Sequence, residues 1–298
     1  MQFGKVLHPE TIDFYLPEDH TSTSKVLQKS TRKKLKMHIG CAKWNRQDLK
    51  GFYPRGTKDE LNYYSSQFNA IELNATFYNL FPKDQFKKWY LKTSPDFKFY
   101  PKLTKGISHE QALNQKAIEY TKYYIENISA LKEKLGCVFL QMHESFNPND
   151  FKLLENYLKQ WPKHIPLAVE LRHSDWFNTT EISLRLYQLF EAYNIITVIT
   201  DTAGRRDLLH MALTTSKVFI RFVSANHITD YSRLDQWANR LNSWKQQGIG
   251  EINFFVHQNL EIESVKLAAY FIKKLNTNLQ TNLKMPRTLN DQQQMSLF

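Results

Sequence analysis

The sequence has few of the residues that build disulfide scaffolds, metal clusters or membrane spans. Its 298 residues include only two cysteines. Neither lies in a CxxC motif, so a disulfide framework and a structural zinc site are both disfavoured. No apolar run approaches the roughly 20 residues that cross a bilayer, and the N-terminus lacks the apolar segment of a secretory signal. The sequence therefore predicts a cytoplasmic protein with no membrane partner.

Apolar and basic residues are plentiful by contrast. The chain is 42% hydrophobic and 14% aromatic, which is enough for a large packed core and too much for a disordered chain. The formal net charge of +11 predicts anionic partners, either nucleic acid or an anionic small molecule. A solvated surface rich in scattered lysines is the alternative explanation of this charge.

From residue 36 onward, eight short apolar runs alternate with longer amphipathic segments. The short runs are rich in Val, Ile, Phe and Tyr, as buried parallel strands are, and the longer ones show helical spacing of apolar residues. Eight such units predict an α/β fold, a single-domain (β/α)₈ barrel. A doubly wound sheet is the alternative, but no GxGxxG motif follows the first run. The predicted strands span 36–42, 69–77, 97–103, 136–142, 166–172, 195–201, 217–223 and 251–257.

The chain divides into three predicted segments. Residues 36–280 form the barrel, and residues 1–35 are an N-terminal extension that packs on it. Residues 281–298 are polar and predict a flexible C-terminal tail. The connection after the sixth strand, residues 201–216, shows little helical periodicity.

Polar residues recur at the C-terminal ends of the predicted strands. Because side chains alternate along a strand, Ile71 and Leu73 should face the helices, which leaves Glu72 pointing into the barrel. Barrel active sites lie at this end of the strands, so the pattern predicts a site. The alternative is a paired network that merely fills the barrel. The predicted inward side chains are Glu72, Asn74, Lys102, Gln141, His143, Glu170, Arg172, Asp201, Arg221 and His257, with His173 directly after the fifth strand.

This set of residues leaves several chemistries open. The carboxylates with His257 could bind a divalent metal, and the cations could hold a phosphate or carboxylate. Glu72 and Glu170 could instead act as an acid–base pair on a sugar. No spaced signature such as HExxH separates these options. The candidate catalytic residues are Glu72, Lys102, Glu170, Asp201 and His257, and the aromatic residues that could stack on a base or sugar include Trp44, Tyr53, Phe77, Tyr78 and Trp176.

Several motifs in one order resemble a known family. IGCAKW, GFYP, IELNATFY, FLQM, VELRHSDW and ITDT are together similar to the YecE-like family, a family of barrel proteins without an established function. The resemblance covers residues 38 to about 273 and implies a (β/α)₈ fold. The recurring polar positions that it implies are Trp44, Tyr53, Glu72, Asn74, Thr76, Tyr78, Lys102, His109, Gln141, Glu170, Arg172, His173, Trp176, Asp201 and Arg221.

The chain ends in the pentapeptide QMSLF. It resembles the peptide with which bacterial DNA polymerases and repair proteins bind the sliding clamp. Gln294 supplies an amide, and Met295, Leu297 and Phe298 supply apolar anchors for a preformed groove. The sequence therefore predicts the sliding clamp as a partner, and folding of these residues onto the barrel is the alternative.

Three functions remain open from the sequence. The first is a hydrolase or lyase acting on a phosphate-bearing or nucleic-acid-derived substrate, as some barrel enzymes of DNA repair do. The second is a non-catalytic module that binds an anionic ligand or nucleic acid while tethered to the replication clamp. The third is a carbohydrate-active enzyme that uses the two glutamates.

Overall fold

The computed structural model describes residues 4–30 and 34–287, and within them eight parallel strands form one sheet in the order β3-β2-β1-β8-β7-β6-β5-β4. Backbone hydrogen bonds of 2.9 Å from Gly136 to Phe99 and from Leu103 to Phe139 join β3 to β4. These bonds close the sheet, and the predicted (β/α)₈ barrel is confirmed. The strands are β1 (Lys36–Cys41), β2 (Ala70–Leu73), β3 (Lys98–Pro101), β4 (Val138–Gln141), β5 (Leu167–Glu170), β6 (Ile196–Thr202), β7 (Lys217–Ser224) and β8 (Glu251–Gln258).

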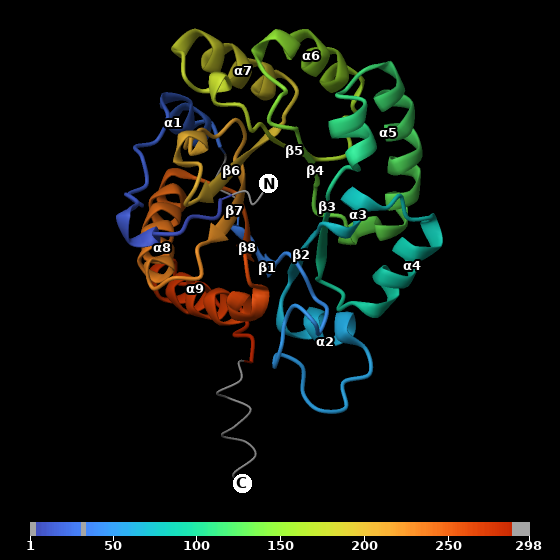
Figure 1. Ribbon diagram of the computed structural model, residues 1–298, viewed down its shortest axis with the longest axis vertical. Helices are drawn as coiled ribbons and strands as arrows, with labels where there is room; N and C mark the ends of the chain where they lie inside the picture. Colours follow the sequence, from blue (N-terminus) through green and yellow to red (C-terminus); the bar gives the residue numbers. More distant parts are fainter. Residues whose placement is uncertain (1–3, 31–33, 288–298) are drawn as a thin grey trace.

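Helices surround the strands on all sides (Figure 1). Capping side chains begin several of them: the Asp59 carboxylate accepts from the Asn62 amide, and the Asn114 side chain accepts from the Ala117 amide. The α-helices are α1 (Thr21–Gln28), α2 (Glu60–Gln67), α3 (Ala75–Tyr78), α4 (Lys83–Lys92), α5 (Gln115–Ile128), α6 (Phe151–Gln160), α7 (Thr180–Ala192), α8 (Thr229–Gln247) and α9 (Ser264–Asn278).

Seven short helical turns complete the described elements. The segment η2 has π-helical hydrogen bonds, and the other six are 3₁₀ turns. They are η1 (Pro9–Thr11), η2 (Gly106–Glu110), η3 (Ser129–Lys134), η4 (Pro148–Asp150), η5 (Ser174–Trp176), η6 (Arg206–Leu208) and η7 (Glu261–Glu263).

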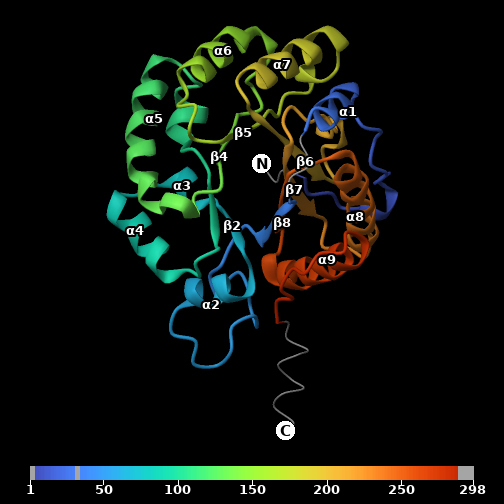
Figure 2. The ribbon, with the colours of Figure 1, turned by 180° about the vertical axis from the view of Figure 1, so that it is seen from behind.

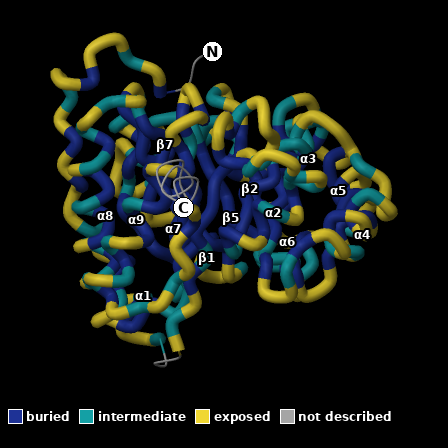
Figure 3. The backbone as a smooth tube through the Cα atoms, turned by 90° about the horizontal axis from the view of Figure 1, so that it is seen from below, coloured by how far each residue is buried: buried dark blue, intermediate teal, exposed yellow. Residues whose placement is uncertain are grey.

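Two apolar cores stabilise the barrel, and the strands are buried at the centre of the fold (Figure 3). The larger core packs the outer faces of the strands against the helices. The smaller one fills the barrel interior with large rings, so the interior is packed rather than hollow. Gly136 is required there, because a Cβ atom at this position would lie 2.4 Å from the Tyr100 ring. The interior residues are Ala70, Tyr100, Cys137, Phe139, Ala168, Ile196, Val198, Phe219 and Phe255.

The N-terminal extension supplies a helix where the repeat lacks one. The connection from β6 to β7 contains the short turn η6 and no α-helix among its described residues. Helix α1 lies at this position, between α7 and α8 (Figures 1 and 2). Thr23 donates to the Met211 carbonyl at 2.9 Å and accepts from the Leu213 amide at 3.0 Å. Leu27 is completely buried, so α1 covers the side of the barrel that the short connection leaves open.

The described part of the predicted tail, residues 281–287, lies against the barrel. The Leu283 amide donates to Asn276 at 2.8 Å, and the Arg287 amide donates to Gln67 at 3.1 Å. The clamp-like residues Gln294, Met295, Leu297 and Phe298 lie outside the described residues. Across the described ranges, none of the helices combines the length and the apolar character needed to span a bilayer.

Candidate active site

A buried arginine joins two buried glutamates at the C-terminal end of the strands. Arg221 of β7 donates to both carboxylate oxygens of Glu72 on β2, at 2.9 Å from Nη2 to Oε1 and 3.1 Å from Nε to Oε2. Its Nη1 donates to Glu170 Oε2 on β5 at 2.8 Å. All three side chains are at most 6% exposed. One guanidinium therefore compensates two carboxylates from opposite parts of the sheet.

Three further side chains extend this network toward β3 and β4. Arg172 Nε donates to Glu170 Oε1 at 2.8 Å, and the Gln141 amide donates to Glu170 Oε2 at the same distance. Gln141 then accepts from Lys102 Nζ at 2.7 Å. The Lys102 ammonium also lies 3.9 Å from the centroid of the Phe77 ring. Lys102 thus contacts a neutral amide and an aromatic face.

The opposite side of the network ends in a histidine and an amide. His257 Nε2 of β8 lies 2.8 Å from Glu72 Oε2, and the Asn74 amide donates to Glu72 Oε1 at 2.9 Å. His257 keeps 13% of its side chain exposed, so the network reaches the surface here. Together these contacts connect six of the eight strand ends, and we call the set the barrel-end cluster: Glu72, Asn74, Lys102, Gln141, Glu170, Arg172, Arg221 and His257.

The arginines keep both glutamates of the cluster ionised. Burial by itself would raise the pKa of Glu72, but the charges of Arg221 and His257 outweigh it and hold that pKa well below its usual range. Burial opposes ionisation of Glu170 in the same way, and Arg172 with Arg221 lowers its pKa well below the ordinary value. Both carboxylates are therefore charged at neutral pH.

Lys102, in contrast to the glutamates, is held partly in its neutral form. Burial, followed by the charges of Arg221 and Arg172, lowers its pKa to about 7. The charges of Glu170 and Glu72 raise the pKa of Lys102. Because these carboxylates bond to the arginines, their effect does not compensate for the lowering caused by burial. A lysine whose amine is partly neutral at physiological pH is a candidate base or nucleophile.

Two histidines beside the cluster, His109 and His143, form what we call the histidine edge. His109, from η2, packs against the Phe77 ring at 4.9 Å and the His143 ring at 5.2 Å. Burial, then Lys102, His143 and Arg172, lowers the pKa of His109 to about 4. His109 is therefore neutral near pH 7, and the positive charge of Arg172 near this edge favours a negatively charged ligand.

Asp201 was expected to face inward, and this prediction is wrong. Its carboxylate accepts from Arg233 Nη2 at 2.8 Å and from the Trp237 indole at 2.7 Å, both on α8. The barrel interior instead receives Ile196 and Val198 from β6. Both partners of Asp201 come 32 and 36 residues later in the chain, so no pattern within the strand itself indicates that this residue faces the helices. Asp201 therefore bonds the end of β6 to α8 and lies outside the cluster.

Two aromatic residues expected to stack on a ligand are also buried elsewhere. Tyr53 donates its hydroxyl to the Trp44 carbonyl and is 6% exposed. Trp176 is completely buried, and its indole donates to the Phe146 carbonyl at 2.8 Å. Neither ring presents a face to the cluster, and that prediction is corrected for both.

The other predicted residues lie around the rim. Trp44 is half-buried and meets the Trp89 ring edge-on at 5.9 Å. Tyr78 is 70% exposed. His143 is exposed and bonds to Ser145, and His173 accepts from the Asp175 amide at the start of η5. Thr76 is buried, and its hydroxyl donates to the Leu73 carbonyl at 2.8 Å.

One residue near the site was not predicted. Arg205, in the loop after β6, donates from Nη2 to the Arg172 carbonyl at 3.2 Å and pairs with Asp207. The GRRD sequence that follows a strand end could have indicated it, because loops at this end of a barrel line the site.

The donor set fits neither of two predicted chemistries. Among the described residues, no group of three or more His, Cys, Asp or Glu side chains is placed to hold a metal ion, and both glutamates already bond to arginines. A glycosidase pair requires one protonated carboxyl group, whereas Arg221 keeps Glu72 and Glu170 ionised. The arrangement is better suited to anion binding with a lysine as the reactive group.

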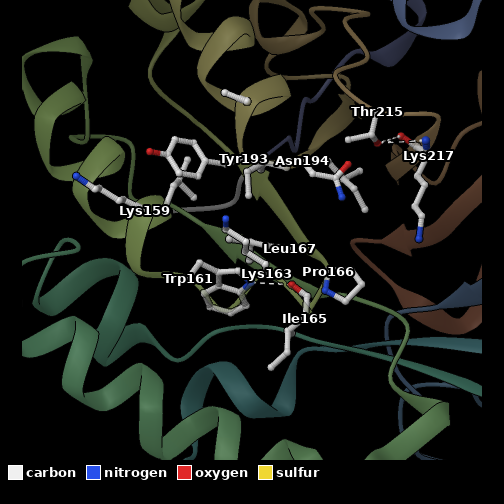
Figure 4. A pocket seen from close by; sticks show the side chains of 14 residues that line it. Lys159, Trp161, Lys163, Ile165, Pro166, Leu167, Tyr193, Asn194, Thr215 and Lys217 are labelled. Carbon is white, nitrogen blue, oxygen red and sulfur yellow. Dashed lines mark hydrogen bonds between the residues drawn. The ribbon is translucent and has the colours of Figure 1, made fainter. Parts of the chain in front are cut away.

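A separate cavity of about 390 Å³ opens at the opposite end of the strands (Figure 4). Lys159, Trp161 and Lys163 line it beside Tyr193 and Lys217, which come just before β6 and at the start of β7. The Trp161 indole N–H already donates to the Ile165 carbonyl at 2.7 Å. None of the lining residues belongs to the cluster, so we place the candidate site at the other end.

The fold and the site together define a (β/α)₈ barrel protein with a charged cluster at the C-terminal ends of its strands. The chain belongs to the family described as "Protein of unknown function DUF72", which it matches over residues 38–293.

Two relatives that are similar in sequence support this assignment. The chain is 26% identical over 232 residues to the UPF0759 protein YecE of Escherichia coli (strain K12), which covers 70% of this chain and 82% of YecE. It is 30% identical over 159 residues to the UPF0759 protein YunF of Bacillus subtilis (strain 168), covering 48% and 52% of the two chains. The predicted resemblance to the YecE-like family is confirmed.

Two solved structures share the fold. A DUF72 family protein from Enterococcus faecalis V583 has a TM-score of 0.66 at 17% identity and covers 84% of this chain and 99% of its own. A DUF72 family protein from Thermotoga maritima MSB8 has a TM-score of 0.63 at 23% identity, with coverage of 81% and 99%.

Proposed function

We propose that the barrel-end cluster is the active site of a hydrolase or lyase that acts on a phosphate-bearing or nucleic-acid-derived substrate. The observation that carries this proposal is that the buried glutamates have ion-pair partners, whereas the buried lysine of the cluster does not among the described residues. Arg221 bonds to both glutamates and Arg172 bonds to Glu170, while no carboxylate of the described residues forms an ion pair with Lys102. An amine held in this way costs stability, which a structural plug would not require.

Each group has a proposed role. Arg172 and the histidine edge hold the anionic part of the substrate, since guanidinium and imidazole donors suit phosphate oxygens. Lys102 is the proposed catalytic residue, because its pKa of about 7 lets it accept or donate a proton near neutral pH. Glu72 and Glu170 are positioning residues that fix the arginines. His257, at the exposed end, is a second proton carrier.

The distribution of charge supports an anionic substrate. Residues 43–105 contain twelve Lys and Arg and six Asp and Glu, a net of +6 out of +11 for the chain. This segment includes the loop after β1, which lies at the same end of the barrel as the cluster.

The test is to measure turnover and binding separately. Phosphorylated sugars and abasic-site DNA are offered to the protein, and released phosphate or cut strand is followed beside the heat of binding. Lys102→Met should abolish turnover and leave binding within about twofold, while Arg172→Gln should weaken binding about tenfold or more. The exposed Lys87→Met is the control. Binding that Arg172→Gln leaves unchanged would contradict the proposed site.

The second candidate is a non-catalytic module that binds nucleic acid, and the same basic segment favours it. It predicts that Arg172→Ala and Arg221→Ala weaken binding while neither the wild type nor any variant shows turnover. Measured turnover by the wild type would eliminate it.

A further inference from the structure

The position of the Lys102 amine is unusual for a lysine. It follows β3 and is 6% exposed, although its inward position points it to the partly open end of the barrel. The Phe77 ring covers one side of the ammonium group at 3.9 Å, and the Phe139 ring lies 5.8 Å away. The Gln141 carbonyl oxygen accepts its hydrogen bond. The Lys102 amine is therefore surrounded mainly by aromatic rings and one neutral amide, next to the charged groups of the cluster.

Charged groups from several strands act on Lys102. Arg221 on β7 and Arg172 after β5 oppose its protonation, whereas Glu170 on β5 and Glu72 on β2 favour it. His109 on η2 lies nearby but is neutral near pH 7, because its own pKa is about 4. The net effect is a lowered pKa for Lys102, because burial acts in the same direction as the two arginines. With a pKa of about 7, roughly half of this amine is neutral at pH 7, against about one in three thousand for a lysine with the ordinary pKa near 10.5.

We propose that Lys102 is a nucleophile that forms an imine with the carbonyl carbon of a phosphate-bearing aldehyde or ketone. This inference rests on the function proposed above for the same site and narrows its substrate to carbonyl compounds. Lysine amines in apolar surroundings are suited to this reaction because the attacking form is the neutral one.

The chemical step balances without an added oxidant or reductant. The Nζ lone pair attacks the carbonyl carbon, and the C–N bond forms as the carbonyl π bond opens onto oxygen. Both N–H protons leave with that oxygen as water, and a C=N bond remains. Protonation of this nitrogen draws electrons from the imine carbon and acidifies the C–H bond of the next carbon, the α carbon. His257, the second proton carrier, takes the α proton, the released electron pair forms a double bond between the α and β carbons, and a phosphate on the β carbon leaves with its bonding electrons, which is a lyase reaction.

The surroundings match both parts of such a substrate. Arg172 lies on the same bonded path as Lys102, through Glu170 and Gln141, and supplies positive charge for the phosphate. The Phe77 ring packs on the Lys102 ammonium, and the half-buried His109 ring packs on Phe77, so these rings limit the access of water that would hydrolyse the imine.

Borohydride trapping tests the inference directly. The full-length protein is incubated at pH 7 with glycolaldehyde phosphate, or with a duplex oligonucleotide carrying one abasic site, and is then reduced with sodium borohydride. Reduction converts an imine into a stable secondary amine, which peptide mass spectrometry locates. The two probes distinguish a small sugar phosphate from a nucleic acid as the source of the carbonyl. Unphosphorylated glycolaldehyde is the matched control for the phosphate.

The expected result is at least tenfold more adduct on Lys102 than on the exposed Lys87, with either phosphorylated probe. The adduct should disappear in Lys102→Arg, whose guanidinium forms no reducible imine, and should fall in Arg172→Gln and with unphosphorylated glycolaldehyde. Circular dichroism of each variant verifies that it is folded.

Binding of the same probes, measured without borohydride, separates the two proposals. If a probe binds in a manner that depends on Arg172 but no adduct forms on Lys102, the imine is wrong and the proposed anion-binding active site stands. Adduct spread equally over exposed lysines also overturns the imine. If neither probe binds, the proposed function fails for this substrate class, and the inference fails with it.

Discussion

At the scale of single residues, Arg221 is the centre of the structure's polar chemistry. Its guanidinium bonds to both Glu72 and Glu170 and so joins the two carboxylates. Two buried negative charges and one buried positive charge are stable together only because their hydrogen bonds are complete.

Replacing Arg221 by methionine should therefore destabilise the protein strongly. The change leaves the buried carboxylate of Glu72 without its guanidinium, and we expect the free energy of unfolding to fall by about 3–5 kcal/mol. Urea denaturation at pH 7 measures it. The triple variant Glu72→Gln, Glu170→Gln, Arg221→Met should recover a large part of the loss. A loss under about 1 kcal/mol in the single variant would show that the network is not the compensated cluster described above.

Lys102 gives a stability prediction with a defined pH window. Its pKa is about 7 in the folded protein and 10.5 ordinarily, so between these values the unfolded chain binds one more proton than the folded one. The stability of the wild type should then rise with pH from 7 to 10.5 at this site. Lys102→Met lacks this dependence and should be more stable by about 1–4 kcal/mol at pH 7.

Urea denaturation of the wild type and Lys102→Met at pH 7, 8, 9 and 10 gives the difference at each pH. This difference should shrink as the pH rises, while that between the wild type and Lys87→Met should be independent of pH. A constant difference for Lys102→Met would mean that the folded protein keeps this lysine charged.

At the scale of elements, the sequence predicted the barrel because every strand and most helices carry their own periodic signal. Alternation in β2 and β5 correctly placed Glu72 and Glu170 inside. It failed for β6, where Asp201 faces outward because Arg233 on a distant helix supplies its partner. Long-range partners of this kind leave no local pattern. The same is true of Trp176, whose burial depends on Phe146 and Phe151.

Helix α1 is the element whose role the sequence did not reveal. Because it occupies the gap beside the helix-free β6–β7 connection, its apolar contacts should contribute to the stability of the barrel. Leu27→Ala removes a completely buried side chain and should lower the free energy of unfolding by about 2–5 kcal/mol. The exposed Lys25→Ala on the same helix should change it by less than about 0.5 kcal/mol. Equal effects of the two substitutions would contradict this role.

At the scale of the whole molecule, the chain combines a barrel with a terminal peptide of different character. The family match ends at residue 293, directly before the QMSLF sequence. A net charge of +11 gives the whole protein an attraction for polyanions that weakens with added salt. Both properties are compatible with a barrel that works near nucleic acid.

The terminal peptide makes a prediction that is independent of the active site. The full-length protein should bind the bacterial sliding clamp with a dissociation constant in the micromolar range, and truncation after Gln293 should abolish the binding. Surface plasmon resonance with immobilised clamp measures both proteins, and the full-length double variant Leu297→Ala, Phe298→Ala controls for chain length. Equal binding by the full-length and truncated forms would remove the clamp as a partner of this peptide.

The central claim is that the barrel end holds a lysine amine that is partly neutral at physiological pH, and the most direct test is to titrate that amine. Protein labelled with lysine carrying ¹⁵N at Nζ and ¹³C at Cε is followed by NMR from pH 5 to 11, and Lys102→Arg assigns the signal. We expect one lysine resonance to titrate with a midpoint near pH 7 and to be missing from the variant. If every lysine resonance titrates only above about pH 9.5, Lys102 is an ordinary charged lysine and the proposed active site loses its reactive group.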